Sequence, residues 1–149
     1  MSVSPRFVLD TDHVSLLQRG NPAIVTRMQG IEPTDCAVTV ITQLEQVQGR
    51  LAQIHSIKQE ADAPARFRLL QATIAFYRDI IVLPYSDSAA ALFFQLRQAR
   101  LRIGTQDLRI ASIALVTGAT VITRNGRDYQ QVPGLAIEDW SKPPAVSSD

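Results

Sequence analysis

Short apolar runs rich in β-branched residues alternate along this chain with longer stretches of helical periodicity. The apolar runs predict strands at residues 7–9, 36–41, 80–83, 120–123 and 135–137. Periodicity and capping residues predict helices at residues 13–19, 22–29, 42–60, 64–79, 87–101 and 106–117. Strands separated by helices need crossover connections, which make the strands parallel and place helices on both faces. We therefore expect an α/β fold, a three-layer α/β/α sandwich with a mostly parallel central sheet.

Length and composition suit one folded domain. The chain has 149 residues, of which 46% are apolar and 19% charged, so intrinsic disorder is excluded for most of it. A net charge of +1 does not indicate a nucleic-acid binder driven by charge alone. With one cysteine, no signal peptide and no apolar run of membrane length in the sequence, we expect a cytoplasmic protein. We place the domain at residues 1–141 and expect the Pro/Ser-rich tail, 142–149, to be disordered.

Four acidic residues lie at or just beyond the ends of predicted elements: Asp10, Glu45, Asp107 and Asp128. Open α/β sheets bind ligands outside the carboxyl ends of their strands, so these side chains are expected to converge there. Carboxylates brought together repel one another and resist ionisation unless a cation neutralises them. An all-oxygen site without cysteine or a dedicated histidine suits Mg²⁺ or Mn²⁺.

Each of these acids also has a purely structural interpretation. Asp10 is placed to cap the first helix, and the spacing Thr42-x-x-Glu45 matches a capping box. Asp107, in the first turn of a helix, complements the helix dipole. Asp128 follows an Asn-Gly turn and suits a turn position. Singly these interpretations compete with the metal site, whereas the four acids in this order favour it.

The acids lie within segments that resemble the PIN-domain ribonucleases of the VapC toxin type. The matching segments are residues 8–12, 37–45, 103–111, 121–129 and 132–140, and the resemblance spans residues 6–141. It implies a PIN-like fold, a pocket of the four acids holding Mg²⁺ or Mn²⁺, hydrolysis of RNA phosphodiesters, a homodimer and a small VapB-like antitoxin. The chain departs from the family at Asp12, where Asn is common, and around its Glu, at residues 43, 44 and 46–48.

The same residues suffice for a metal-assisted hydrolysis. Bound cations would clamp the scissile phosphate, activate a water and stabilise the leaving oxygen. We assign Asp10 and Asp107 as primary ligands, with Glu45 and Asp128 binding directly or through water. Further candidates, for contacts behind the ligands or to RNA phosphate, are Thr11, Asn125, Arg124 and Arg127. The two arginines equally suit a solvated turn.

Two other functions stay open on the sequence. Residues 10–14 fit the D-x-D-x-[TV] opening of phosphatases resembling the haloacid-dehalogenase type, with Asp10 as nucleophile and Asp12 as acid/base. Such enzymes also need a pocket lysine, and the only lysines are Lys58, within a predicted helix, and Lys142, in the tail. The other alternative is a non-catalytic interaction module.

Apolar positions of the predicted helices point to partners. We expect a two-fold homodimer whose interface uses some of these positions: Leu51, Ile54, Phe67, Leu70, Phe93 and Phe94. We also expect Phe67, Leu70, Ile74 and Tyr77 to face inward, and Leu44 and Leu51 to lie on an apolar stripe. The antitoxin is expected to dock near Val14, Leu17 and Val47 and to place an Arg or Lys at the acids.

Overall fold

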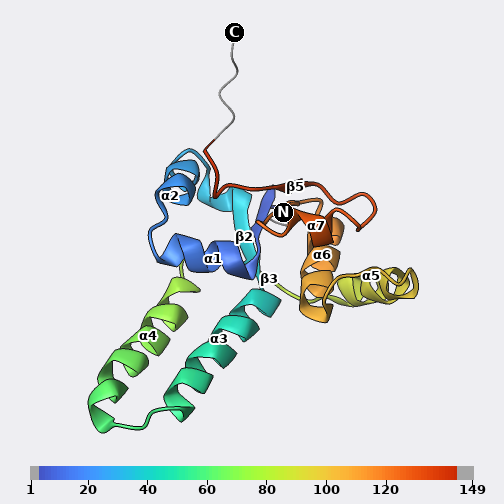
Figure 1. Cartoon of the computed structure of the whole chain (residues 1–149). Coiled ribbons are helices and arrows are strands. Elements are labelled where there is room, and N and C mark those ends of the chain that lie inside the picture. Colours follow the sequence, from blue (N-terminus) through green and yellow to red (C-terminus); the bar gives the residue numbers. More distant parts are fainter. Residues whose placement is uncertain (1–3, 144–149) are drawn as a thin grey trace.

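The computed structural model describes residues 4–143, and over these it forms a five-stranded parallel sheet (Figure 1). The strands are β1 (Phe7–Leu9), β2 (Cys36–Thr39), β3 (Ile81–Leu83), β4 (Thr120–Ile122) and β5 (Ile137–Glu138). Their order in the sheet is β3-β2-β1-β4-β5, and each neighbouring pair is parallel. Val8 of the central strand pairs with Ala37 on one side and Val121 on the other. The predicted α/β class with a parallel sheet is confirmed.

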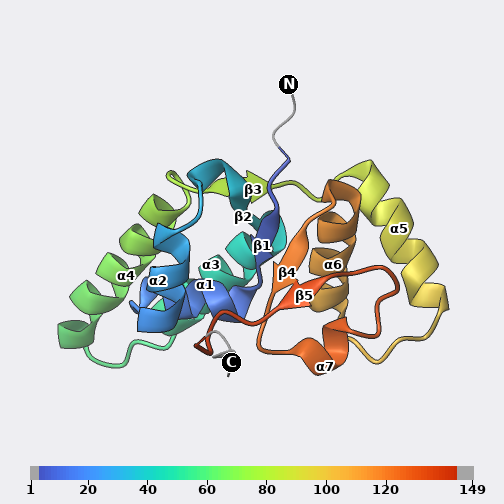
Figure 2. The same ribbon diagram turned by 90° about the horizontal axis from the view of Figure 1, so that it is seen from above.

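Helices connect the strands and cover both faces of the sheet (Figure 2). The α-helices are α1 (Thr11–Gln18), α2 (Pro22–Gln29), α3 (Val40–His55), α4 (Ala63–Phe76), α5 (Asp87–Gln98), α6 (Thr105–Thr117) and α7 (Gly126–Tyr129). Two 3₁₀ turns, Pro33–Asp35 and Glu60–Asp62, precede β2 and α4. No helix within residues 4–143 is long and apolar enough to cross a membrane.

Alternate residues of each strand enter two separate cores. Val8 and Val121 pack on one face with buried residues of α5 and α6. Their neighbours Leu9 and Ile122 pack on the other face, against α1, α2 and Trp140. The two-residue period of a strand produces this division, and it explains why the strands are continuous apolar runs. The three layers are therefore helices, sheet and helices.

Several element boundaries differ from the predicted ones. The strand predicted to reach residue 41 ends at Thr39, because the Thr39 hydroxyl accepts a hydrogen bond from the Thr42 amide (3.2 Å) and caps α3. Helices α3, α4 and α5 each end three or more residues earlier than predicted. The first helix begins at Thr11, two residues earlier than predicted, and Asp10 caps it. The predicted tail lies largely outside the described residues.

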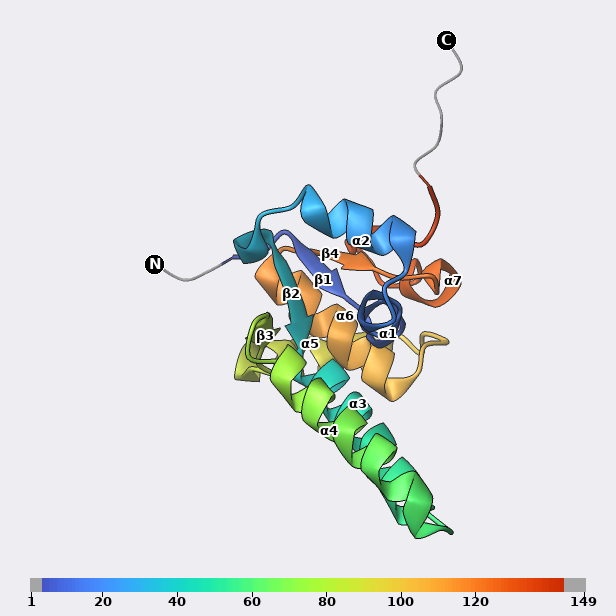
Figure 3. The ribbon, with the colours of Figure 1, turned by 90° about the vertical axis from the view of Figure 1, so that its left-hand side faces the viewer.

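Helices α3 and α4 form an antiparallel hairpin that projects beyond the sheet (Figures 1 and 3). Because the outer part of the hairpin packs mainly on itself, apolar side chains predicted to face inward remain exposed. Phe67 is 50% exposed and Ile74 47%, and Leu44 and Leu51 are exposed on α3. Tyr77, just after α4, is buried as predicted. The predicted inward orientation is therefore wrong for Phe67 and Ile74 and confirmed for Tyr77.

Candidate active site

The carboxyl ends of β1, β2 and β4 bring the four acids to one edge of the sheet. Asp10 directly follows β1, and its amide extends the ladder by donating to the Ile122 carbonyl of β4 (3.0 Å). Glu45 lies in the second turn of α3, after β2. Asp128 lies on α7, after β4, and Asp107 is in the first turn of α6. The crossovers of a parallel sheet place these segments together although up to 118 positions separate them.

The pKa of Asp107 is affected by the other three acids. Burial raises the pKa of Asp107, and the negative charges of Asp10, Glu45 and Asp128 raise it further, while a hydrogen bond from Tyr129 acts in the opposite direction. Electrostatic repulsion of this kind requires the carboxylates to lie near one another. Asp10, Glu45 and Asp128 therefore lie within electrostatic reach of Asp107.

Each acid is held by a neutral hydrogen-bond donor. The Asp10 carboxylate accepts from the His13 amide (2.9 Å) and caps α1, and Glu45 accepts from the Thr11 hydroxyl (2.7 Å). The Asn125 amide donates to Asp128 (3.0 Å), and the Tyr129 hydroxyl donates to Asp107 (3.2 Å). No lysine or arginine within residues 4–143 forms an ion pair with any of the four. Their negative charge is thus oriented without being neutralised by a basic side chain.

Of the two predicted capping roles, that of Asp10 is confirmed and that of Glu45 is wrong. Asp10 does cap α1, a role compatible with its second oxygen binding a cation. The capping box is wrong, because Thr39 caps α3 and Glu45 instead accepts from Thr11, 34 positions earlier. Thr11 also shares a hydrogen bond with Thr42 (3.0 Å). The predicted neighbour Thr11 therefore orients Glu45 directly.

Asp12 and Arg124 are engaged with each other. The Arg124 guanidinium donates from Nε to one Asp12 oxygen (2.7 Å) and from Nη2 to the other (3.0 Å), in an exposed bidentate pair. The extra negative charge at Asp12 is thereby neutralised by Arg124. To bind an RNA phosphate, Arg124 would have to leave Asp12. Arg127 is exposed on α7.

Two residues that the sequence analysis assigned to no role support the acids. Tyr129 is fully buried and holds Asp107, and burial together with the carboxylates raises its pKa so that the hydroxyl stays protonated. His13 is also fully buried: its Nε2 accepts from the Trp140 amide (3.3 Å), and its Nδ1 lies 3.5 Å from Asp10. His13 thus links the end of the domain to Asp10. No local sequence signal marks either contact, because both depend on tertiary packing.

The donor set fits a hard divalent cation. Carboxylate oxygens, with no cysteine among them, are the ligands that Mg²⁺ and Mn²⁺ prefer. Within the described part of the chain, no three His, Cys, Asp or Glu side chains lie close enough together to form a ready-made metal cluster. Burial raises the pKa of Asp107, and repulsion from the other acids raises it further. A cation between them would relieve that repulsion.

Comparison with known proteins gives one consistent result. No family model matches the chain. It is 31% identical over 139 residues to ribonuclease VapC1 of Haemophilus influenzae strain R2866, covering 91% of this chain and 98% of that protein. It is 28% identical over 139 residues, with the same coverage, to the tRNA(fMet)-specific endonuclease VapC of Salmonella typhimurium.

Solved structures agree with these sequences. The structure of DNA-bound VapBC from Salmonella typhimurium matches with a TM-score of 0.74 and 28% identity, over 91% of this chain and 98% of that one. VapBC-1 from nontypeable Haemophilus influenzae shares the fold, with a TM-score of 0.73 at 24% identity over 91% and 98% of the two chains. Sequence, fold and the acids at the strand ends lead to the same assignment: this chain belongs to the VapC family of ribonucleases.

Proposed function

We propose that this protein is an endoribonuclease that hydrolyses RNA phosphodiester bonds with Mg²⁺ or Mn²⁺ and acts in the cytoplasm as the toxin of a toxin–antitoxin pair. The observation that carries the metal-dependent chemistry is the set of four carboxylates at the carboxyl edge of the sheet, each oriented by a neutral donor and none paired with a lysine or arginine of the described residues. Like charges brought together repel one another, and a bound cation would relieve that repulsion and supply the chemistry. Membership of the VapC family supports RNA as the substrate.

We assign the metal-binding roles as follows. Asp10 and Asp107 hold the metal directly, and Glu45 and Asp128 hold it directly or through water. When bound, Mg²⁺ or Mn²⁺ lowers the pKa of a water and neutralises charge on the phosphate. The chain's own contribution is orientation: Thr11 fixes Glu45, and donors to the other carboxylates keep their remaining oxygens available.

Two side chains on or beside α7 complete the proposed site. Asn125 orients Asp128 through its amide. Arg127 is exposed on the same short helix and is our candidate for a phosphate contact. Arg124 contributes indirectly, because its pairing with Asp12 removes a negative charge that would otherwise repel RNA.

The structure disfavours the phosphatase alternative. Asp12, the acid/base in that interpretation, is half exposed and paired with Arg124. Glu45 is built into the site through Thr11, whereas the phosphatase mechanism leaves it without a role. Lys58 is exposed in the turn after α3, so it does not supply the pocket lysine.

We propose a VapB-like antitoxin as the partner, supported by the VapBC complexes among the similar structures. Val14 is fully buried, so the predicted contact there is wrong. Leu17, in contrast, lines an apolar cavity of about 260 Å³ together with Met28, Ile31 and Phe76, and Glu32 and Asp79 also line it. An apolar antitoxin segment with a basic residue fits this lining, and a separate segment of the antitoxin would place an Arg or Lys at the acids. A two-fold homodimer completes the proposed assembly.

The test is cleavage of RNA by the purified chain. We expect cleavage with Mn²⁺ or Mg²⁺, none with excess EDTA, and none by Asp10→Asn. The matched control is Asp35→Asn, since Asp35 precedes β2 and lies at the opposite edge of the sheet. Cleavage that persists in EDTA, or in Asp10→Asn, would contradict the proposal.

A further inference from the structure

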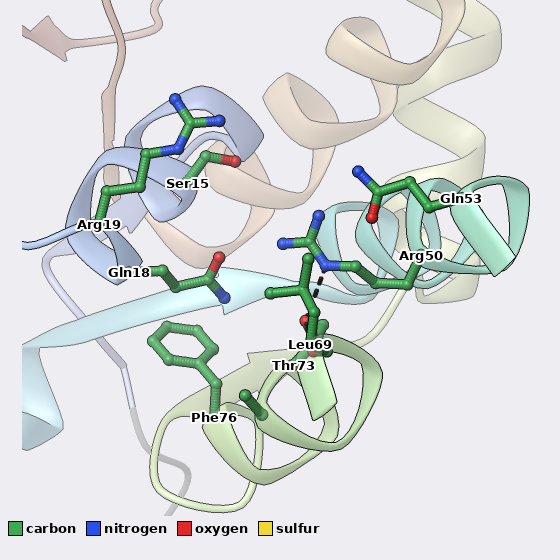
Figure 4. Close-up of a pocket in the computed structure, with 9 residues that line it drawn as sticks. Ser15, Gln18, Arg19, Arg50, Gln53, Leu69, Thr73 and Phe76 are labelled. Carbon is green, nitrogen blue, oxygen red and sulfur yellow. Dashed lines mark hydrogen bonds between the residues drawn. The ribbon is translucent and has the colours of Figure 1, made fainter. Parts of the chain in front are cut away.

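A second site lies beside the acids, in a cavity of about 440 Å³ between α1, α3 and α4 (Figure 4). Its polar lining comes from both sides: Ser15 and Gln18 on α1 with Arg19 directly after it, and Arg50 and Gln53 on α3. Helix α4 contributes apolar surface, including Phe76. The volume falls within the range of pockets that enclose small organic ligands.

The cavity is electropositive. Arg19 and Arg50 both line it, and none of its nine lining residues is an Asp or Glu. The Arg50 Nε donates to the Thr73 hydroxyl (2.9 Å), which in turn donates to the Leu69 carbonyl (2.8 Å). Figure 4 shows the bond from Arg50 Nε to Thr73, and the terminal nitrogens of Arg50 have no hydrogen-bond partner among the described residues. A fixed guanidinium suits bidentate binding of a phosphate.

Two other side chains add selectivity for a planar ring. Phe76 lines the cavity while half-buried, so part of its ring remains available for stacking. The Gln53 amide has no hydrogen-bond partner among the described residues, and it carries both a donor and an acceptor. An unstacked nucleobase is recognised in proteins by such a combination of an aromatic face, an arginine and an amide.

The cavity shares helices α1 and α3 with the acids. Ser15 is one turn beyond Thr11 on α1, and its hydroxyl donates to the Thr11 carbonyl (3.2 Å). On α3, Arg50 is five positions beyond Glu45, which corresponds to about 7.5 Å along the helix axis. A chain whose phosphate lies at the acids therefore reaches the cavity with an adjacent nucleotide.

We propose that this cavity receives one unstacked nucleotide of the RNA next to the scissile phosphate, an inference that rests on the proposed nuclease function. The acids and their cation contact only phosphate, which carries no sequence information. Selection of a particular RNA thus requires a base-reading surface nearby, and this cavity supplies one. In this assignment Arg19 and Arg50 bind the flanking phosphate, Phe76 stacks on the base and Gln53 contacts its edge.

Charge distinguishes this cavity from the one assigned to the antitoxin. The neighbouring cavity at Leu17 is lined by two acids, Glu32 and Asp79, and no basic residue, so it repels RNA. The cavity at Arg50 has the opposite sign. Complementarity therefore favours RNA at Arg50 and an apolar, basic segment at Leu17.

The experiment uses the full chain and RNA hairpins with a randomised single-stranded loop. Arg19→Gln and Arg50→Gln are compared with Arg6→Gln, since Arg6 precedes β1 at the edge of the sheet away from the acids. We expect the two cavity variants to lose about tenfold in kcat/KM through KM, and to reduce the salt dependence of binding by about 0.7 per arginine. Mn²⁺ affinity and the Arg6 variant should be unchanged.

Sequencing of the cut sites tests base reading. Gln53→Ala should relax the base preference at one position relative to the cut. Binding of the hairpins in EDTA provides a readout independent of cleavage. Because Arg19 makes no hydrogen bond to other described side chains, Arg19→Gln keeps the test valid even if Arg50→Gln unfolds.

The outcomes separate the two proposals. If the wild type cuts RNA and both cavity variants match it in KM, salt dependence and preference, the cavity inference is wrong and the nuclease stands. Loss of antitoxin binding without loss of RNA binding would also overturn it, and would assign the cavity to the antitoxin. If the wild type binds hairpins through Arg19 and Arg50 but cuts none, the cavity inference holds and the nuclease proposal fails.

Discussion

At the scale of single residues, the site depends on neutral donors that hold carboxylates without cancelling their charge. Thr11, Asn125 and Tyr129 each donate to a different acid. An arginine in any of these places would stabilise the carboxylate equally well but would compete with a cation for it. The choice of hydroxyls and an amide is therefore physically consistent with a site that must bind metal.

Tyr129→Phe tests this orienting role. The variant keeps the buried ring and removes only the hydroxyl that holds Asp107. We expect Mn²⁺ affinity, measured by calorimetry, to fall about tenfold, as it does when a partner behind a metal ligand is lost. The matched control is Tyr77→Phe, because the Tyr77 hydroxyl donates to Gln46 instead (2.5 Å). Equal Mn²⁺ affinities for the two variants would show that the Tyr129 hydroxyl does not position Asp107 for metal.

Asp107→Asn tests the electrostatic cost of the site. Burial and the neighbouring acids raise the folded-state pKa of Asp107 above its unfolded value near 3.8, so protonation favours the folded state. The wild type therefore loses stability as the pH rises through the folded-state pKa. We expect the variant to have the higher free energy of unfolding at pH 7 without metal, and the difference to vanish below about pH 3.8.

Denaturant titrations at pH 7 and at acid pH measure that difference. Saturating Mn²⁺ should reverse the order at pH 7, because metal binding stabilises only the wild type. A variant that is less stable at pH 7 without metal would show that the hydrogen bond from Tyr129 outweighs repulsion among the acids.

The positions of the acids could be predicted from sequence, but the contacts that support them could not. Asp10, Glu45 and Asp128 follow β-branched runs, and the carboxyl ends of parallel strands share one edge. The bond between Thr11 and Glu45 spans 34 positions, and that between His13 and Trp140 spans 127. Such pairs depend on how helices pack, which no periodicity in the sequence records.

At the scale of elements, the junction between β2 and α3 connects a capping residue to the site. Val40 and Ile41 are β-branched and were predicted to extend the strand, but the helix begins at Val40 because Thr39 caps it. Local propensity is a weak determinant there, and the cap outweighs it. The cap also sets the helical phase that directs Glu45 toward Thr11.

Thr39→Ala tests the link between this cap and the site. Loss of a capping hydroxyl should lower the free energy of unfolding by about 1 kcal/mol. Ser86→Ala is the matched control, since Ser86 caps α5 in the same way, with its hydroxyl accepting from Ala89, and α5 carries none of the four acids. We expect equal losses of stability in thermal melts, and a weaker Mn²⁺ affinity only in Thr39→Ala. If Mn²⁺ affinity falls in both variants, the cause is the general loss of stability and not the link between Thr39 and the site.

The hairpin of α3 and α4 shows the limit of helical periodicity. The apolar stripe on these helices is real, yet periodicity does not tell whether the sheet extends far enough to cover it. In the structure the hairpin extends past the sheet, so Phe67 and Ile74 remain about half exposed. The same geometry opens the cavity between the hairpin and α1 (Figure 4).

At the scale of the whole molecule, charge and apolar surface are separated. The net charge is only +1, but the charged side chains are segregated. The four acids lie at one edge of the sheet, and two arginines line the cavity between α1, α3 and α4. Apolar side chains are exposed on two different bodies, the α3–α4 hairpin and the α5–α6 pair (Figure 2). An isologous interface can use only a patch that leaves the acids open to RNA.

We predict that the homodimer forms through α5 and α6, around Phe94. This side chain is 71% exposed, the most of any large apolar side chain in the described structure, and Val116 on the adjacent α6 is 44% exposed. The neighbouring Phe93 contacts Arg97 and Arg109 in cation–π pairs, so it is already partnered and Phe94 is the aromatic left for a partner copy. Large aromatic side chains are among the residues that dominate interface energetics.

Phe94→Glu is therefore expected to convert the dimer into a folded monomer, because it places a charge at the centre of a self-complementary patch. Sedimentation at micromolar concentration measures the change, and a thermal melt verifies the fold. Phe67→Glu on the hairpin makes the same chemical change at a side chain that is 50% exposed, and it should leave the dimer intact. The reverse result, a monomer with Phe67→Glu and a dimer with Phe94→Glu, would move the interface to the hairpin and place the partner copy beside the cavity that we assign to RNA.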